Sequence, residues 1–151
     1  MKVTPFVLPY HLHSFQMTQI IPYMFDLCNA DSTKCYMDAY AELCWKNLDW
    51  IVKANTVSED DFEQKWSATV ADAFKLNQDD ILALWSSKDS HNTNWRVRED
   101  WKYAASVGLS GTPQAFVNGV KLDTYPESAQ DWEDVFALIF QPGNNEKFLT
   151  K

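Results

Sequence analysis

The segment VGLSGTPQAFVNG, Val107 to Gly119, says more about the fold than any other part of the 151-residue sequence. Gly108 follows a run of helical periodicity and is a typical residue at which a helix ends. Asn118-Gly119 separates two short apolar runs, Gln114 to Val117 and Val120 to Thr124, and best supplies the positive φ angles of a type I′ turn. The segment therefore predicts a helix end followed by a β-hairpin.

Helical periodicity dominates the sequence between Ser14 and Val107, where apolar residues recur at steps of three and four. Four or five helices are expected there. By contrast, Lys2 to Leu8 is short and partly β-branched, and Pro5 and Pro9 punctuate it, which suits one strand that ends in an extended turn. Pro126 suits the first turn of a last helix, whose expected buried face is Trp132, Val135, Phe136 and Ile139. The predicted order is strand, helices, hairpin and helix, which is typical of a layered domain.

Local signals predict several of the helix boundaries. Pro22 is expected to kink or break the first helix. The apolar stripe between Lys34 and Ala54 predicts one long amphipathic helix. Ser58, with Asp61 three residues later, resembles a weak capping box, and Asn77 can cap the helix that follows.

Composition and charge exclude several classes of function. Hydrophobic residues make up 46% of the chain and aromatic residues 15%, which indicates one compact domain rather than a disordered chain. The net charge of −8 repels phosphate backbones, so nucleic acid is not an expected partner. No apolar run approaches the roughly 20 residues that span a bilayer, so a membrane is not an expected partner either.

Between the predicted helix end at Gly108 and the predicted hairpin, Gly111-Thr112-Pro113 resembles the cis-proline loop of DsbA-like thioredoxin-fold proteins. Phe6 to His11 is a weaker match to the strand and turn that precede the inserted helices of that family. The resemblance implies an α/β, thioredoxin-like (DsbA-type) fold over residues 1–151. In it, residues from about 14 to 107 form a large inserted helical region. Residues 108–140 form the cis-proline loop, the hairpin of a small sheet and the final helix.

The same resemblance implies that the Thr112-Pro113 bond is cis. Gly111, Thr112 and Pro113 would then form a substrate-binding edge, to which an extended peptide could add as a strand. The first strand and the CxxC-bearing helix of the family are missing ahead of Lys2. Without that motif the nucleophilic thiolate of the family is also missing.

Two functions follow from the resemblance. The first is a redox-inactive module that binds an extended peptide or a protein partner, or serves a structural role. The alternative is an incomplete copy of a thiol-disulfide oxidoreductase whose CxxC lies upstream of Met1. In-frame codons for that motif would decide for the enzyme. The kappa-class glutathione transferase branch of the same fold is a third and weaker match.

The three cysteines, Cys28, Cys35 and Cys44, have neither redox nor zinc spacing. Cys28 and Cys35 flank a polar loop, so a structural disulfide between them is geometrically plausible in an oxidising compartment. Three reduced, mostly buried thiols are the equal alternative. The possible bridge and the family resemblance both favour the secretory pathway over the cytosol.

No metal or cofactor is predicted. His11 and His13 could form a metal pair, but no third ligand has suitable spacing, so turn or surface histidines are expected instead. Most of the seven tryptophans have helical spacing and are expected in the core. Without its first strand, a thioredoxin-like sheet would leave the edge from Lys2 to Val7 open, so a homo-oligomer or a partner chain on that edge is expected.

Overall fold

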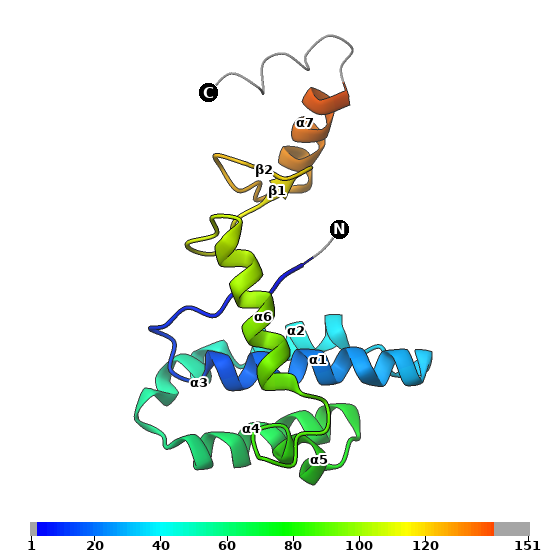
Figure 1. The fold of residues 1–151 in the computed structure, drawn as a ribbon, viewed down its shortest axis with the longest axis vertical. Coiled ribbons are helices and arrows are strands. Elements are labelled where there is room, and N and C mark those ends of the chain that lie inside the picture. The colour runs from blue at the N-terminus through cyan, green and yellow to red at the C-terminus, as the bar shows by residue number, and fades with distance from the viewer. Residues whose placement is uncertain (1–2, 141–151) are drawn as a thin grey trace. The chain divides into compact units, whose positions relative to one another are not determined.

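The computed structural model describes residues 3–140, most of which are helical (Figure 1). They belong to two compact units that meet at Ser110 and Gly111, and each unit is described by itself. The first unit contains, in chain order, α1 (Ser14–Ala30), the 3-10 helix η1 (Ser32–Lys34), α2 (Met37–Lys46), α3 (Leu48–Lys53), the 3-10 helix η2 (Ala54–Thr56), α4 (Glu59–Phe74), α5 (Gln78–Ala83) and α6 (Thr93–Ser106). Within this unit α6 crosses α1, and α4 packs beside α5 (Figure 1).

Several predicted helix ends are confirmed by hydrogen bonds of the kind that the sequence suggests. Ser58 Oγ accepts the amide N–H of Asp61 (3.2 Å) at the start of α4, and Asn77 caps α5 in the same manner. Gly108 has a φ of +85° after α6, and the amide of Leu109 donates to the carbonyl of Ala104 (3.1 Å). This backbone bond satisfies one of the carbonyls left open at a helix end.

Two predictions concern helix continuity. Of the kink or break expected at Pro22, the break is wrong, because helix α1 continues through Pro22 to Ala30. The prediction of one long helix from Lys34 to Ala54 is also wrong, because this segment is divided into η1, α2, α3 and η2. Asn47 lies between α2 and α3, and its side-chain amide donates to the carbonyl of Leu43 (2.8 Å). An asparagine side chain that bonds the backbone in this way competes with helical hydrogen bonding.

The core of the first unit lies where α1, α2 and α4 meet. Its largest fully buried side chains are Trp66, Tyr40, Phe62, Ile20 and Met24. Two consecutive hydrogen bonds cross this core. Trp66 Nε1–H donates to Tyr40 Oη (3.3 Å), and the Tyr40 hydroxyl donates to the carbonyl of Met17 (2.7 Å). These bonds satisfy the polar groups of two buried side chains and join three helices.

The second unit contains the predicted hairpin. Strand β1 (Phe116–Val117) pairs antiparallel with β2 (Val120–Lys121). Asn118 and Gly119 have φ values of +51° and +82°, so the predicted turn with two positive φ angles is confirmed. The strands are shorter than expected. Helix α7 (Ala129–Phe140) follows, and the prediction of its buried face is wrong because none of its residues is buried.

The expected α/β, thioredoxin-like fold is wrong. In residues 3–140 the chain is mostly helical, and its sheet consists of β1 and β2 only. The segment expected as a strand, Lys2 to Leu8, has no strand among its described residues, 3–8. Phe6 stacks on Trp101 at 5.5 Å between ring centroids, and Trp101 Nε1–H donates to the carbonyl of Val7 (3.0 Å). Side-chain packing of this kind overrides β-propensity, which depends strongly on context.

Candidate functional site

An open apolar depression lies between the residues that precede α1 and the α2–α3 segment. We call it the apolar groove and define it by Leu12, Trp45, Leu48, Ile51 and Val52. Its volume is about 240 Å³. Except for half-buried Ile51, these side chains are exposed, and 71% of the Trp45 side-chain surface is accessible. A contiguous apolar surface on a folded domain marks an interaction site more often than isolated exposed residues do.

Helical periodicity places these side chains on one face of α2 and α3. The amide of Asn47 donates to the carbonyl of Leu43, and the amide of Ile51 donates to that of Asn47, so the four-residue pattern persists across the junction. Trp45, Leu48 and Val52 are therefore spaced by three and four residues along one face. Three exposed charged residues directly follow groove residues in the sequence: Lys46, Asp49 and Lys53. Lys46 also pairs with Glu42 (3.4 Å), so the apolar centre of the groove has charges of both signs near it.

His13 contributes a polar atom to the lining of the groove. Its side chain is only 2% exposed, which contradicts the expected turn or surface histidine. The ring stacks on Phe62 at 4.1 Å, and Nε2 lies 3.1 Å from the carbonyl of Ala54. Because a carbonyl oxygen only accepts, Nε2 is the donor of this contact, and the buried Nδ1 has no hydrogen-bond partner among the described residues.

Cys44 also lines the groove but is a weak nucleophile. Burial raises the pKa of its thiol to about 11. Because the thiolate is the reactive form of cysteine, a thiol with this pKa is almost entirely unreactive near neutral pH. The groove therefore offers apolar contact and no activated thiol.

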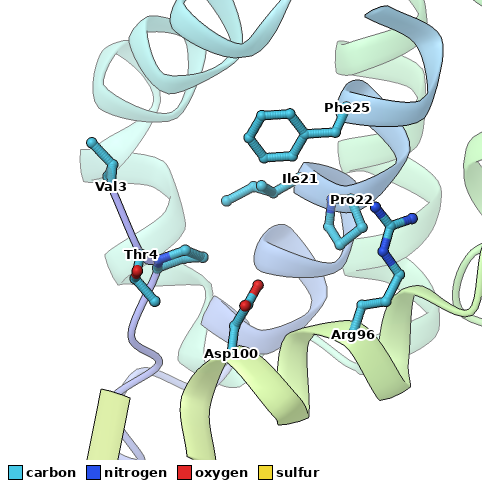
Figure 2. Close-up of a pocket in the computed structure, with 8 residues that line it drawn as sticks. Val3, Thr4, Ile21, Pro22, Phe25, Arg96 and Asp100 are labelled. Carbon is cyan, nitrogen blue, oxygen red and sulfur yellow. The ribbon is translucent and has the colours of Figure 1, made fainter. Parts of the chain in front are cut away.

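A second pocket, of about 390 Å³, lies between residues 3–5, α1 and α6. Figure 2 shows Ile21 and Phe25 of α1 on one wall and Asp100 and Arg96 of α6 on another. Its lining mixes apolar and charged groups.

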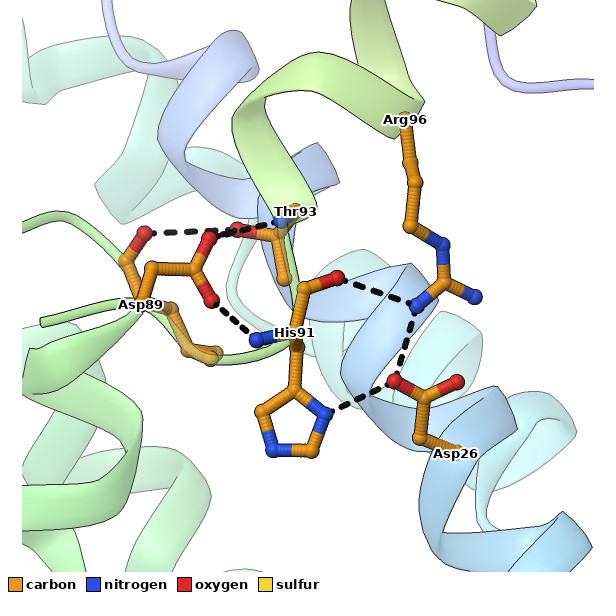
Figure 3. Close-up of polar contacts among 6 residues, drawn as sticks. Asp26, Asp89, His91, Thr93 and Arg96 are labelled. Atoms are coloured by element: carbon orange, nitrogen blue, oxygen red, sulfur yellow. Dashed lines mark hydrogen bonds and ion pairs between the residues drawn. The ribbon is translucent and has the colours of Figure 1, made fainter.

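Arg96 belongs to a polar network that joins α1 to the loop before α6 (Figure 3). Asp26 Oδ2 accepts from Arg96 Nη1 (2.8 Å) and lies 2.7 Å from His91 Nδ1. Partial burial alone would raise the pKa of Asp26, but the hydrogen bonds from Arg96 and His91 lower it below its usual value. Asp89 accepts the Thr93 amide (2.6 Å) and so caps α6.

This network resembles a His-Asp pair of the type found in hydrolases, but it lacks a nucleophile. Among the described residues, no side-chain hydroxyl or thiol hydrogen-bonds the His91 ring. The charge of Arg96 is compensated by Asp26. The network therefore serves to hold α1 against the start of α6.

The predicted peptide-binding edge, Gly111 to Pro113, and the cysteines Cys28 and Cys35 lie outside both cavities, whereas residues 3–5 of the predicted partner-binding edge line the second pocket. The Thr112-Pro113 bond is cis, the isomer that the resemblance implies. Gly111 is half-buried, and Thr112 and Pro113 are exposed. Their role as a peptide-binding edge stays a prediction.

Cys28 and Cys35 lie at disulfide-bonding distance, with their Cα atoms 4.3 Å apart. The pair encloses η1 and joins the last turn of α1 to the residues that precede α2.

His11 and His13, considered above as a metal pair, have no third ligand near them among the described residues. Residues 3–140 hold no group of three or more His, Cys, Asp or Glu side chains placed to bind a metal ion.

Sequence reasoning missed the apolar groove because it assigned most tryptophans to the core. Trp66 is buried, but Trp45, Trp95 and Trp101 are exposed, so that assignment is wrong for them. The available signal was that Trp45 and Val52 are apolar yet fall outside the stripe that contains Tyr40. A helical segment with apolar residues on two sides has more apolar surface than one core contact can cover.

Comparisons with protein-family models, with curated proteins and with solved structures find no match. Among the helices described in residues 3–140, none has the length and apolar character that crossing a membrane requires. The apolar groove is therefore identified as the candidate site from its geometry and exposure alone.

Proposed function

We propose that this chain is a protein-interaction module whose apolar groove binds the apolar face of an amphipathic helix from a protein partner. The supporting observation is the exposure of Trp45 beside Leu48 and Val52 on one continuous helical face. Tryptophan is among the residues that contribute most to binding energy at protein interfaces. Helices commonly bind in apolar grooves through residues spaced by three and four positions.

The dimensions of the groove favour a helix over a small molecule. Pockets for small ligands have volumes of about 300–1,000 Å³ and cover most of the ligand, whereas this depression of about 240 Å³ is open and its large side chains are exposed.

The proposed function includes no thiol chemistry. Cys28 and Cys35 lie at disulfide-bonding distance from each other, and the raised pKa of Cys44 keeps that thiol protonated. Disulfide exchange requires an accessible thiolate, so the cysteines support a structural role.

Selection from a display library of helical peptides on the full chain would test the proposal. Selected peptides would be titrated against the wild type, Trp45→Ala and the matched control Trp95→Ala. Trp95 is also a largely exposed tryptophan (64%) but lies on α6, outside the groove. Calorimetry or fluorescence anisotropy would give the dissociation constants.

Trp45→Ala should weaken binding at least about tenfold, since removing a hot-spot residue costs about 2 kcal/mol or more. Trp95→Ala should leave the affinity unchanged. Selected peptides should also be enriched in apolar residues with helical spacing. Failure to select any helical peptide, or equal affinity for both variants, would contradict the proposal.

A further inference from the structure

The second pocket contains a carboxylate without a partner. All of its lining residues belong to the first unit, and Arg96 and Asp100 of α6 are the charged ones among them. Asp100 is half-buried and has no hydrogen bond or ion pair with any described residue. Figure 2 shows its carboxylate pointing across the pocket toward Ile21 and Phe25 of α1. A partly buried carboxylate is more stable with a cation beside it, and the described part of the chain supplies none.

The charge of Arg96 is not available to Asp100. Arg96 precedes Asp100 by four positions on α6, a spacing at which an arginine and an aspartate can pair on a helix. Its Nη1 instead donates to Asp26 Oδ2 of α1 (2.8 Å) and to the carbonyl of His91 (3.3 Å). Because Asp26 already compensates Arg96, the carboxylate of Asp100 gives the pocket a net negative charge when His91 is neutral.

The neighbouring charges on α6 leave this result unchanged. Glu99 pairs with Lys102 (2.8 Å). Arg98 donates to the side chain of Asn94 and lies over the ring of Phe15. Neither pair lines the pocket. The net charge of −8 on the whole chain also attracts cations over a longer range.

We propose that this pocket binds a small organic amine, with the ammonium group at Asp100 and an apolar body against Ile21, Pro22 and Phe25. The pocket volume of about 390 Å³ lies at the lower end of the range of about 300–1,000 Å³ for small-ligand sites, which suits a molecule with one ring. The ring of Phe25 is 48% exposed, and an aromatic face attracts a nearby cation. The inference does not rest on the proposed function of the apolar groove.

An amine fits this pocket better than a metal ion or an anion. Metal sites need several ligands, and residues 3–140 place no three His, Cys, Asp or Glu side chains together for that purpose. An anion would be repelled by Asp100 and would find the charge of Arg96 already compensated by Asp26. An ammonium has three N–H donors, and the hydroxyl of Thr4, which also lines the pocket, is a second acceptor beside Asp100.

The test is a titration of the full chain with para-fluorophenethylamine, followed by ¹⁹F NMR of the ligand. The alcohol and the carboxylic acid with the same fluorophenyl group are the control ligands for charge. Asp100→Asn removes the charge with little change of shape, and Phe25→Ala removes part of the apolar wall. Glu99→Gln is the matched control variant, because Glu99 is adjacent to Asp100 on α6 but does not line the pocket.

Wild type and Glu99→Gln should bind the amine saturably with equal affinity, and should bind the alcohol and the carboxylate more weakly. Asp100→Asn should weaken amine binding at least about fivefold, since a charged hydrogen bond in a partly exposed site is lost. Phe25→Ala should weaken it too, and circular dichroism should show unchanged helix content for every variant. No saturable amine binding by the wild type would overturn the inference, as would equal affinity of Asp100→Asn or tighter binding of the carboxylate. Each of these results leaves the proposed function of the apolar groove as it stands.

Discussion

Tyr40→Phe tests whether the core of the first unit is built as described. Tyr40 is buried between α1, α2 and α4, and its hydroxyl donates to the carbonyl of Met17 and accepts from Trp66 Nε1. Phenylalanine preserves the ring and removes the hydroxyl. The buried indole N–H of Trp66 then loses its partner, and leaving a buried polar group unsatisfied costs about 1–3 kcal/mol.

Urea denaturation, monitored by tryptophan fluorescence, would measure this loss as a lower midpoint with an unchanged m-value. Thermal unfolding should show a melting temperature about 2–4 °C lower for each kcal/mol lost in a domain of this size. Tyr36→Phe is the matched control, because Tyr36 is half-buried and its ring stacks on Phe74. A loss below about 0.5 kcal/mol, the size of an ordinary surface substitution, would refute the described core.

Three further predictions concern titrating groups and thiols. Burial, with Glu59 and Asp60 nearby, raises the pKa of Glu63 to about 7, and a raised carboxyl pKa reduces stability as pH rises through it. Glu63→Gln should therefore raise the urea midpoint at about pH 8 and leave it unchanged at about pH 4. Asp26→Asn should lower stability by about 1 kcal/mol near neutral pH, allowing for partial exposure. Because the pKa of Asp26 is lowered, the stability that its ionised form supplies should fade as pH falls through that pKa, and denaturation across pH would show whether it does. The chain should not catalyse insulin reduction, and turnover that a single cysteine substitution abolishes would contradict this.

The sequence was sufficient where structure depends on a few neighbouring residues. Caps at Ser58 and Asn77, the helix end at Gly108 and the turn at Asn118-Gly119 were all predicted, and all are present. Each depends on backbone conformation or on a hydrogen bond within four residues. The proximity of Cys28 and Cys35, which the sequence left open between a bridge and reduced thiols, is similarly local, because seven positions separate them. Such features follow from short-range stereochemistry and need no knowledge of the rest of the fold.

The sequence was insufficient where partners lie far apart along the chain. Trp101 bonds the backbone at Val7, 94 positions away, and the segment expected as a strand is irregular there. His13 is buried because Phe62 and Ala54 come together around it. The resemblance to DsbA-like proteins rested on a loop and a hairpin, both local, and it wrongly implied a sheet among distant segments.

The same limit explains why the candidate site was missed. An apolar residue with helical spacing can face the core or a partner, and periodicity does not distinguish the two. Trp45 and Trp66 both lie in segments of helical periodicity, yet Trp45 is largely exposed and Trp66 is fully buried. Only the packing of α4 against α1 and α2 decides which tryptophan is covered within the chain.

The most direct test of the proposed interaction surface is ¹⁹F NMR of the full chain labelled with 5-fluorotryptophan. Substitution of single tryptophans assigns the resonances of Trp45 and Trp95, which are both exposed on the free chain. A library-selected helical peptide is then added to saturation. The proposed function predicts that the Trp45 resonance shifts on binding and that the Trp95 resonance does not. An unchanged Trp45 resonance in the saturated complex would contradict binding at the apolar groove.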